Sequence, residues 1–111
     1  MSRIYHLAEP DDWRAAQETG SYETSTRGRS LADEGFIHAS TEHQWPQVRR
    51  RFYADVADPL LLLEIDPDRL TSQLIREPVA EAGGEVFPHI YGPLNTDAVL
   101  AVHEVEPPHA G

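Results

Sequence analysis

The chain has 111 residues, of which 9 are basic and 19 are acidic, so its formal net charge at pH 7 is −10. Every basic residue is an arginine, and cysteine is absent. These counts exclude a disulfide framework, a thiolate metal site, a cysteine nucleophile and a Schiff-base lysine. A chain of this length is expected to form one domain. Its acidity disfavours non-specific binding to nucleic acid or to an anionic membrane.

The termini and the apolar runs favour a cytoplasmic protein. Acidic residues at Glu9, Asp11 and Asp12 occupy the place where a signal peptide would have its apolar core. The longest aliphatic run, residues 60–63, is far shorter than the roughly 20 residues needed to span a bilayer. We expect a single domain over residues 1–105, followed by a proline-containing, flexible tail over residues 106–111.

The first elements along the chain are predicted to be a short strand and a helix. Residues 4–7 alternate in the way that is typical of a strand. Pro10 suits the first position of a helix, and Gly20 suits the residue that ends one. Trp13 and Ala16 would form the buried face of this helix.

A second strand and a second helix are predicted next. In the strand, residues 35–40, Phe36 and His38 would share a face. The helix, residues 41–54, would begin with a capping box between Thr41 and Gln44. Four apolar residues at helical spacing would form its buried stripe: Trp45, Val48, Phe52 and Val56.

The remaining elements are predicted to be strands. Residues 60–65 are continuously apolar, which indicates a strand buried on both faces. Residues 73–77 and 85–87 would pair through a hairpin turn at Gly83 and Gly84, and residues 97–105 alternate as a last strand. Two helices in the N-terminal half and five or six strands define an α+β domain.

Three histidines are the first candidates for chemistry. His6, His38 and His89 each lie in or beside a strand with bulky apolar neighbours. One interpretation is three separate core histidines, each bonded to a backbone carbonyl. The other is a shared pocket in which they act as acid or base, as hydrogen-bond donors or as metal ligands, although no spacing typical of a metal site is present. The other three histidines are expected at the surface: His43, His103 and His109.

The segment over residues 87–94, Phe-Pro-His-Ile-Tyr-Gly-Pro-Leu, is the second candidate. Because proline lacks a backbone donor, this segment is ill-suited to a central strand and predicts a stiff loop that presents His89 and Tyr91. The alternative is an edge turn in which Tyr91 fills the core.

Arginines are the third candidate. Arg27 and Arg29 flank Gly28 in a polar loop, where guanidinium groups suit a phosphate or carboxylate. The run over residues 49–51 covers about 200° of a helix surface and is expected to be mostly solvated. Arg51, next to Phe52, would be its inward member.

Few carboxylates stand out from the sequence. Glu64 interrupts an apolar run, so its pKa would depend on whether His89 or an arginine lies beside it. Glu77 follows Arg76 and is interpreted as part of a local ion pair. Ser40 follows His38 by two residues, but the Gly-x-Ser-x-Gly motif of a serine hydrolase is absent.

Together these segments resemble a bacterial family known as domain of unknown function 952. The resemblance covers about residues 3–105, and its most specific parts are Gly-Phe-Ile-His-Ala-Ser at 35–40 and the segment at 87–94. That family is similar to a compact ADP-ribosyltransferase fold, in which two antiparallel sheets surround a cleft that binds NAD in the enzymatic members. The resemblance therefore implies a cleft that binds NAD or an ADP-ribose-type nucleotide, in a transferase-like enzyme.

The resemblance also implies roles for particular residues. His6 would meet the adenosine-side ribose, and His38 and Ser40 would lie near the nicotinamide end. His89 would be the acid or base, with His38 as a second catalytic residue, and Tyr91 would stack on the ligand. The pyrophosphate would meet an arginine from this set: Arg27, Arg29 and Arg51.

The sequence departs from the family pattern at one important point. No glutamate stands in the loop where the catalytic one is expected, so the resemblance implies histidine and arginine chemistry in its place. That combination is closer to the RNA 2′-phosphotransferase branch of the fold, but a net charge of −10 argues against an RNA substrate. The alternatives are a non-catalytic module that binds a small ligand or a protein partner, and a histidine-ligated metal site.

Overall fold

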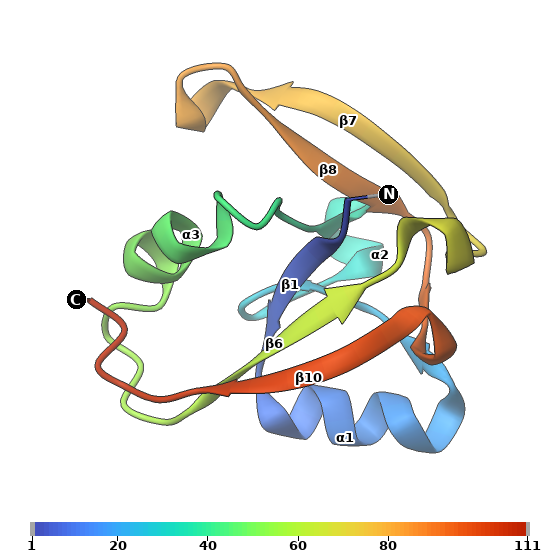
Figure 1. Ribbon diagram of the computed structural model, residues 1–111, viewed down its shortest axis with the longest axis horizontal. Helices are drawn as coiled ribbons and strands as arrows, with labels where there is room; N and C mark the ends of the chain where they lie inside the picture. The colour runs from blue at the N-terminus through green and yellow to red at the C-terminus, as the bar shows by residue number, and fades with distance from the viewer. Residues whose placement is uncertain (1, 111) are drawn as a thin grey trace.

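The computed structural model describes residues 2–110, and its strands form several small antiparallel sheets (Figure 1). The two three-stranded sheets have the orders β1-β6-β10 and β5-β8-β7, and the two-stranded sheets pair β2 with β9 and β3 with β4. The α+β class is therefore confirmed. The sequence predicted two sheets and two helices, whereas the described residues contain four sheets and three α-helices.

The first three-stranded sheet is centred on the aliphatic run. Its strands are β1 (Ile4–Ala8), β6 (Leu60–Ile65) and β10 (Val99–Val105). Leu60, Leu63 and Ile65 of β6 are fully buried, as predicted for a strand that is covered on both faces. The helix α1 (Pro10–Thr19) packs beneath this sheet (Figure 1) and buries Trp13 and Ala16 as expected.

The second three-stranded sheet contains the predicted hairpin. It consists of β5 (Ile37–His38), β7 (Gln73–Val79) and β8 (Glu85–Tyr91). Gly83 and Gly84 lie at the turn with φ of 70° and 85°, values that glycine adopts easily. A short 3₁₀ helix, η2 (Ala80–Ala82), completes the turn.

The segment at 87–94 was predicted to be a loop or edge turn, and that prediction is wrong. Its first five residues belong to β8, the central strand of the sheet. In an antiparallel pair, the N–H and the carbonyl of one residue face the same neighbouring strand. The Pro88 carbonyl accepts from Ala39 N at 3.1 Å, so the nitrogen of Pro88 also faces the β5 side. Because β5 has already ended at His38, the donor that Pro88 lacks interrupts no strand pairing.

The remaining elements are short. The two-stranded sheets are formed by β2 (Ser21–Tyr22) with β9 (Leu94–Asn95) and by β3 (Thr24–Thr26) with β4 (Arg29–Ser30). The helix α2 (Leu31–Glu34) begins with a capping box that Ser30 and Asp33 form. Two further 3₁₀ helices are η1 (Pro67–Arg69) and η3 (Thr96–Ala98). No helix among residues 2–110 is long and apolar enough to cross a membrane.

The helix α3 (Trp45–Phe52) is shorter than predicted. Thr41 N donates to Oε1 of Gln44 at 3.0 Å, so half of the expected capping box forms, but it closes a turn before the helix begins. Phe52 was predicted to be buried and is instead 51% exposed. Because α3 ends there, Tyr53 turns inward and packs with Leu60 and Leu62.

The C-terminal segment corrects a second expectation. His109 was predicted at the surface, but its exposed fraction is 0%. Its Nδ1 accepts a hydrogen bond from Arg49 Nε at 2.9 Å, and its Nε2 donates to the carbonyl of Asp58 at 2.9 Å. Arg49 also donates to the carbonyls of Glu106 and Pro108, so the described part of the tail lies against α3.

Candidate functional site

A cleft of about 1100 Å³ lies between the β7–β8 hairpin and α3. We call it the His89 cleft. Its walls include four of the predicted polar residues: His6, His38, Ser40 and His89. They also include all three of the predicted arginines: Arg27, Arg29 and Arg51. Tyr91 does not line the cleft but lies next to His89, with 37% of its surface exposed.

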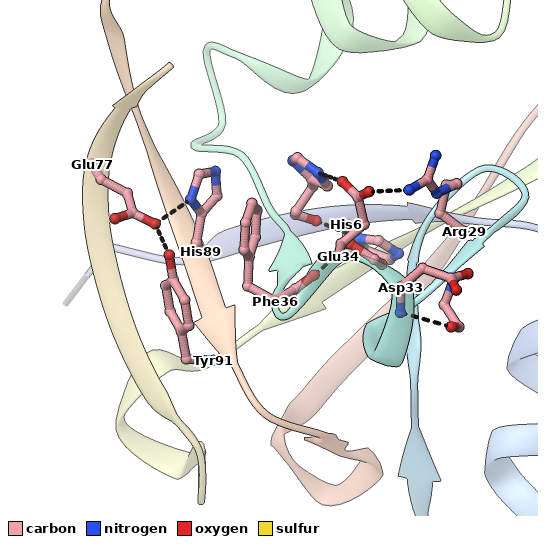
Figure 2. Close-up of polar contacts among 11 residues, drawn as sticks. His6, Arg29, Asp33, Glu34, Phe36, Glu77, His89 and Tyr91 are labelled. Carbon is pink, nitrogen blue, oxygen red and sulfur yellow. Dashed lines mark hydrogen bonds and ion pairs between the residues drawn. The ribbon is translucent and has the colours of Figure 1, made fainter. Parts of the chain in front are cut away.

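His38 and His89 meet in one group of rings with Phe36, and Figure 2 labels Phe36 and His89 of this group. They are direct partners in the pairing of β5 with β8, so their side chains leave the same face of the sheet. Their ring centroids are 5.3 Å apart. Phe36 stacks on His89 at 4.2 Å and meets His38 edge-on at 4.8 Å. The structure therefore brings these two histidines together.

His6 lies behind this group with both ring nitrogens in use. Its Nδ1 donates to the backbone carbonyl of His38 at 2.5 Å, because a carbonyl can only accept. Its Nε2, 2.9 Å from the Tyr22 hydroxyl, then accepts from that hydroxyl. Burial lowers the pKa of His6 to about 4, which keeps the ring neutral at pH 7. His6 thus holds the strand that presents His38.

His89 is the most distinctive group of the cleft. Its Nδ1 donates to Oε1 of Glu77 at 2.7 Å, and the Tyr91 hydroxyl donates to the same oxygen. The hydrogen bond from Tyr91, and next the one from His89, hold the pKa of Glu77 below its usual value. The His89 side chain is buried, and its Nε2 has no hydrogen-bond partner among the described residues. A buried nitrogen in that state costs free energy unless a ligand satisfies it.

Glu77 was not identified from the sequence, where it was interpreted as part of an ion pair with Arg76. The hairpin register pairs Glu77 with Phe87 and Ile75 with His89, so Glu77 and His89 are diagonal neighbours on one face. No sequence signal placed them together, because counting outward from a two-residue Gly83–Gly84 turn would pair Glu77 with Ile90, whereas the actual loop also includes Ala80–Ala82.

His38 has a carboxylate partner of its own. Its Nε2 lies 3.3 Å from Oε1 of Glu34, and Oε2 of Glu34 is 2.8 Å from Arg29 (Figure 2). Burial is the main reason that the pKa of His38 is lowered, and the hydrogen bond to Glu34 opposes that effect. The cleft therefore contains two histidine–carboxylate pairs, one on each side of Phe36.

The three cleft arginines differ in how their charges are matched. Arg27 makes hydrogen bonds of 2.7 and 3.2 Å to the carboxylate of Asp55, and Arg29 pairs with Glu34. Arg51 instead donates to the backbone carbonyl of Glu81 at 2.7 Å. Among the described residues, no carboxylate oxygen lies within 4.0 Å of Arg51.

Ser40 and Glu64, which the sequence also suggested as candidates, make contacts that stabilise the fold. Ser40 pairs with Tyr5 through backbone hydrogen bonds of 2.7 and 2.8 Å, which join the edge of the cleft to β1. Glu64 lies beside Arg3 at 3.5 Å and His103 at 2.9 Å, and not beside His89. Within residues 2–110, no group of three or more His, Asp or Glu side chains is arranged to hold a metal ion.

The fold and the cleft define a small α+β protein with a histidine–carboxylate site. The chain belongs to the family described as "Protein of unknown function (DUF952)", whose model matches residues 7–102. It is similar to the crystal structure of protein CC0527 from Caulobacter crescentus, with 29% identity and a TM-score of 0.79 over 93% of this chain and 85% of that one. The solution NMR structure of CC0527 has 32% identity and a TM-score of 0.65 over 93% and 84% of the two chains.

No curated protein sequence matches the chain. The comparisons thus show the family and an α+β fold shared with CC0527. The similarity to ADP-ribosyltransferases stays a prediction.

Proposed function

We propose that the His89 cleft binds NAD or an ADP-ribose-type nucleotide, and that His89 acts on the bound ligand as a general acid or base. The observation that carries this proposal is the state of the His89 ring. Its Nδ1 is tied to Glu77 at 2.7 Å, while its buried Nε2 has no partner at the wall of a cleft of about 1100 Å³.

The Glu77 carboxylate fixes the tautomer of His89. Because Glu77 accepts from Nδ1, the lone pair of a neutral His89 is on Nε2, where it can accept a proton or hydrogen bond from a ligand hydroxyl. The same carboxylate stabilises the imidazolium that forms when Nε2 takes the proton. Glu77 thus supplies, from the neighbouring strand, a carboxylate that the sequence segment at 87–94 lacks.

The shape and lining of the cleft support a nucleotide. Its volume of about 1100 Å³ is at the upper end of small-molecule sites. Phe36 and Phe52 offer aromatic surfaces, and guanidinium groups suit phosphate oxygens. The two three-stranded sheets, each of which contributes residues to the cleft, support the proposed ADP-ribosyltransferase-like arrangement.

The structure refines the proposed roles of the individual residues. The His38 side chain is 40% exposed and would contact the ligand directly, whereas the His89 side chain is 5% exposed beneath Phe36, so a ligand would reach its Nε2 when that stacked ring moves aside. His6 would act through His38, whose backbone it holds. Tyr91 would hold Glu77 through its hydroxyl and offer the exposed part of its ring to the ligand.

Titration of isotope-labelled protein with NAD and with ADP-ribose tests the binding. We expect chemical-shift changes in the imidazoles of His38 and His89 at millimolar ligand, and weaker binding to the His89→Asn variant. His43→Asn, a change at an exposed histidine outside the cleft, is the matched control. If neither nucleotide shifts the cleft histidines, the proposal is wrong.

A second measurement separates catalysis from binding. Incubation with NAD should release nicotinamide in wild type, with water taking its place on the ribose carbon to give ADP-ribose, and the His89→Asn variant should release much less. Bound NAD that stays intact would overturn the catalytic half of the proposal. The cleft would then be a binding site on a non-catalytic protein.

A further inference from the structure

We infer that Arg51 and Phe52, at the C-terminal end of α3, form the recognition platform for an aromatic base with an adjacent phosphate. This inference rests on the proposed function, because it names which part of the nucleotide α3 would recognise. The platform lies on α3, whereas His89 and Glu77 lie on the hairpin, so one ligand would span two walls of the cleft.

Phe52 supplies the aromatic half of the platform. Helical spacing predicts that it is buried with Trp45 and Val48, yet 51% of its surface is exposed and its side chain lines the cleft. Its backbone is held there, since Arg27 donates to the Phe52 carbonyl at 3.1 Å and also binds Asp55. An aromatic ring held at a cleft wall is suited to stacking against a base.

Arg51 supplies the anion-binding half. Its guanidinium carbon lies 5.4 Å from the centroid of the Phe52 ring. One terminal nitrogen donates to the Glu81 carbonyl at 2.7 Å, which fixes the guanidinium next to the hairpin turn while its other donors stay available. The charges of Arg27 and Arg29 are matched by Asp55 and Glu34, so Arg51 is the cleft arginine without a carboxylate partner among the described residues.

The surroundings of the platform limit the charge of the ligand. Glu81 and Glu85 lie on the hairpin wall of the same cleft. The Glu85 carboxylate accepts from the amides of Gln44 and Gln47, which carry no charge to balance it. A ligand with many phosphates would be repelled by these carboxylates. The platform therefore favours a nucleotide with one or two phosphate groups over a triphosphate or an RNA.

Binding measurements on variants of α3 test this inference. Phe52→Leu should weaken the binding of ADP-ribose about tenfold, the effect expected from losing one stacked base, whereas Phe52→Tyr should keep it. Arg51→Gln should weaken ADP-ribose by about tenfold as well but should hardly affect adenosine, which has no phosphate. Arg50→Gln, a change at an exposed arginine outside the cleft, is the matched control.

The outcomes separate this inference from the proposed function. If wild type binds neither NAD nor ADP-ribose, the proposed function fails and the platform fails with it. If wild type binds ADP-ribose, and Phe52→Leu and Arg51→Gln bind it as tightly as Arg50→Gln does, the cleft binds nucleotides but the platform is wrong. Binding of ATP that is tighter than that of ADP-ribose would overturn the inferred limit on charge.

Discussion

His89 and Glu77 lie on the two strands of one hairpin, and Nδ1 of His89 donates a 2.7 Å hydrogen bond to Oε1 of Glu77. Because Nδ1 is used in this bond, Nε2 is the ring nitrogen of His89 that points away from Glu77. The Tyr91 hydroxyl donates to the same carboxylate oxygen, so His89, Glu77 and Tyr91 form a connected group of three side chains.

Replacement of Glu77 by glutamine should loosen the hold on the His89 ring while leaving the backbone intact. A carboxylate can only accept from Nδ1 of His89, whereas a glutamine amide can also donate, so the preference for the tautomer with the proton on Nδ1 should weaken in the variant. Nitrogen-15 shifts of the imidazole show which ring nitrogen carries the proton. Glu81→Gln is a matched control on the same hairpin. Identical imidazole nitrogen-15 shifts of His89 in wild type and Glu77→Gln would contradict the assigned pair.

His6 should make the stability of the protein depend on pH. Its pKa is about 4 in the folded protein and 6.5 in its unperturbed state. The unfolded chain therefore takes up a proton between these values that the folded protein does not, so stability falls as the pH falls from 6.5 to 4. The full loss is roughly 3 kcal/mol, with no further loss from this group below pH 4.

Urea unfolding of wild type and His6→Gln at a series of pH values tests this dependence. We expect the variant to be less stable at pH 7, because the His38 carbonyl and the Tyr22 hydroxyl lose their fitted partner. Its stability should nevertheless decline less steeply between pH 6.5 and 4. A decline equal to that of wild type would show that another group carries the pH dependence.

Gly92 should be intolerant of any side chain. Its φ is 150°, and a Cβ built there would lie 2.9 Å from Cβ of Ser72, whose hydroxyl donates to the Pro93 carbonyl at 2.7 Å. Gly92→Ala should lower the free energy of unfolding by about 1–3 kcal/mol, from backbone strain and the steric clash together. Chemical denaturation measures the loss.

Gly28→Ala separates the two contributions at Gly92. Gly28 has a φ of 72°, but a Cβ there meets nothing within 4 Å, so this variant has backbone strain without a clash. The double variant Ser72→Ala, Gly92→Ala should regain part of the lost stability. If Gly92→Ala is as stable as wild type, the close approach to Ser72 is absent in solution.

The tail should depend on the contact between Arg49 and His109. His109→Ala leaves the Arg49 Nε and the Asp58 carbonyl without their partner, which should lower the free energy of unfolding by about 1–3 kcal/mol. We expect faster backbone motion at residues 106–110 in nitrogen-15 relaxation, with the rest of the domain unchanged. Arg50→Gln should leave the tail as in wild type. If residues 106–110 are already mobile in wild type, the sequence-based expectation of a flexible tail is correct and the docked arrangement is not.

The sequence by itself determined the elements whose signals are local. The Pro10 start and Gly20 stop define α1, the uninterrupted aliphatic residues define β6, and the Gly83–Gly84 pair defines the hairpin turn. Each of these depends on properties of a few consecutive residues, such as a fixed φ or continuous apolarity. The three histidines were also identified from the sequence, because a polar side chain among bulky apolar neighbours is unusual.

Only the tertiary structure decided how those residues work together. Pro88 is accepted in a central strand because the neighbouring strand β5 is only two residues long, a fact that the sequence around Pro88 does not contain. The partners of the histidines come from other elements, with Glu77 across the hairpin from His89 and Tyr22 beside His6. Phe52 was expected to be buried and is exposed, and His109 was expected at the surface and is buried. Both predictions failed for the same reason, since burial depends on contacts between distant segments. The composition excluded cysteine and lysine chemistry. Only the fold determined which of the many carboxylates and arginines line the cleft, because those residues come from segments far apart in the sequence.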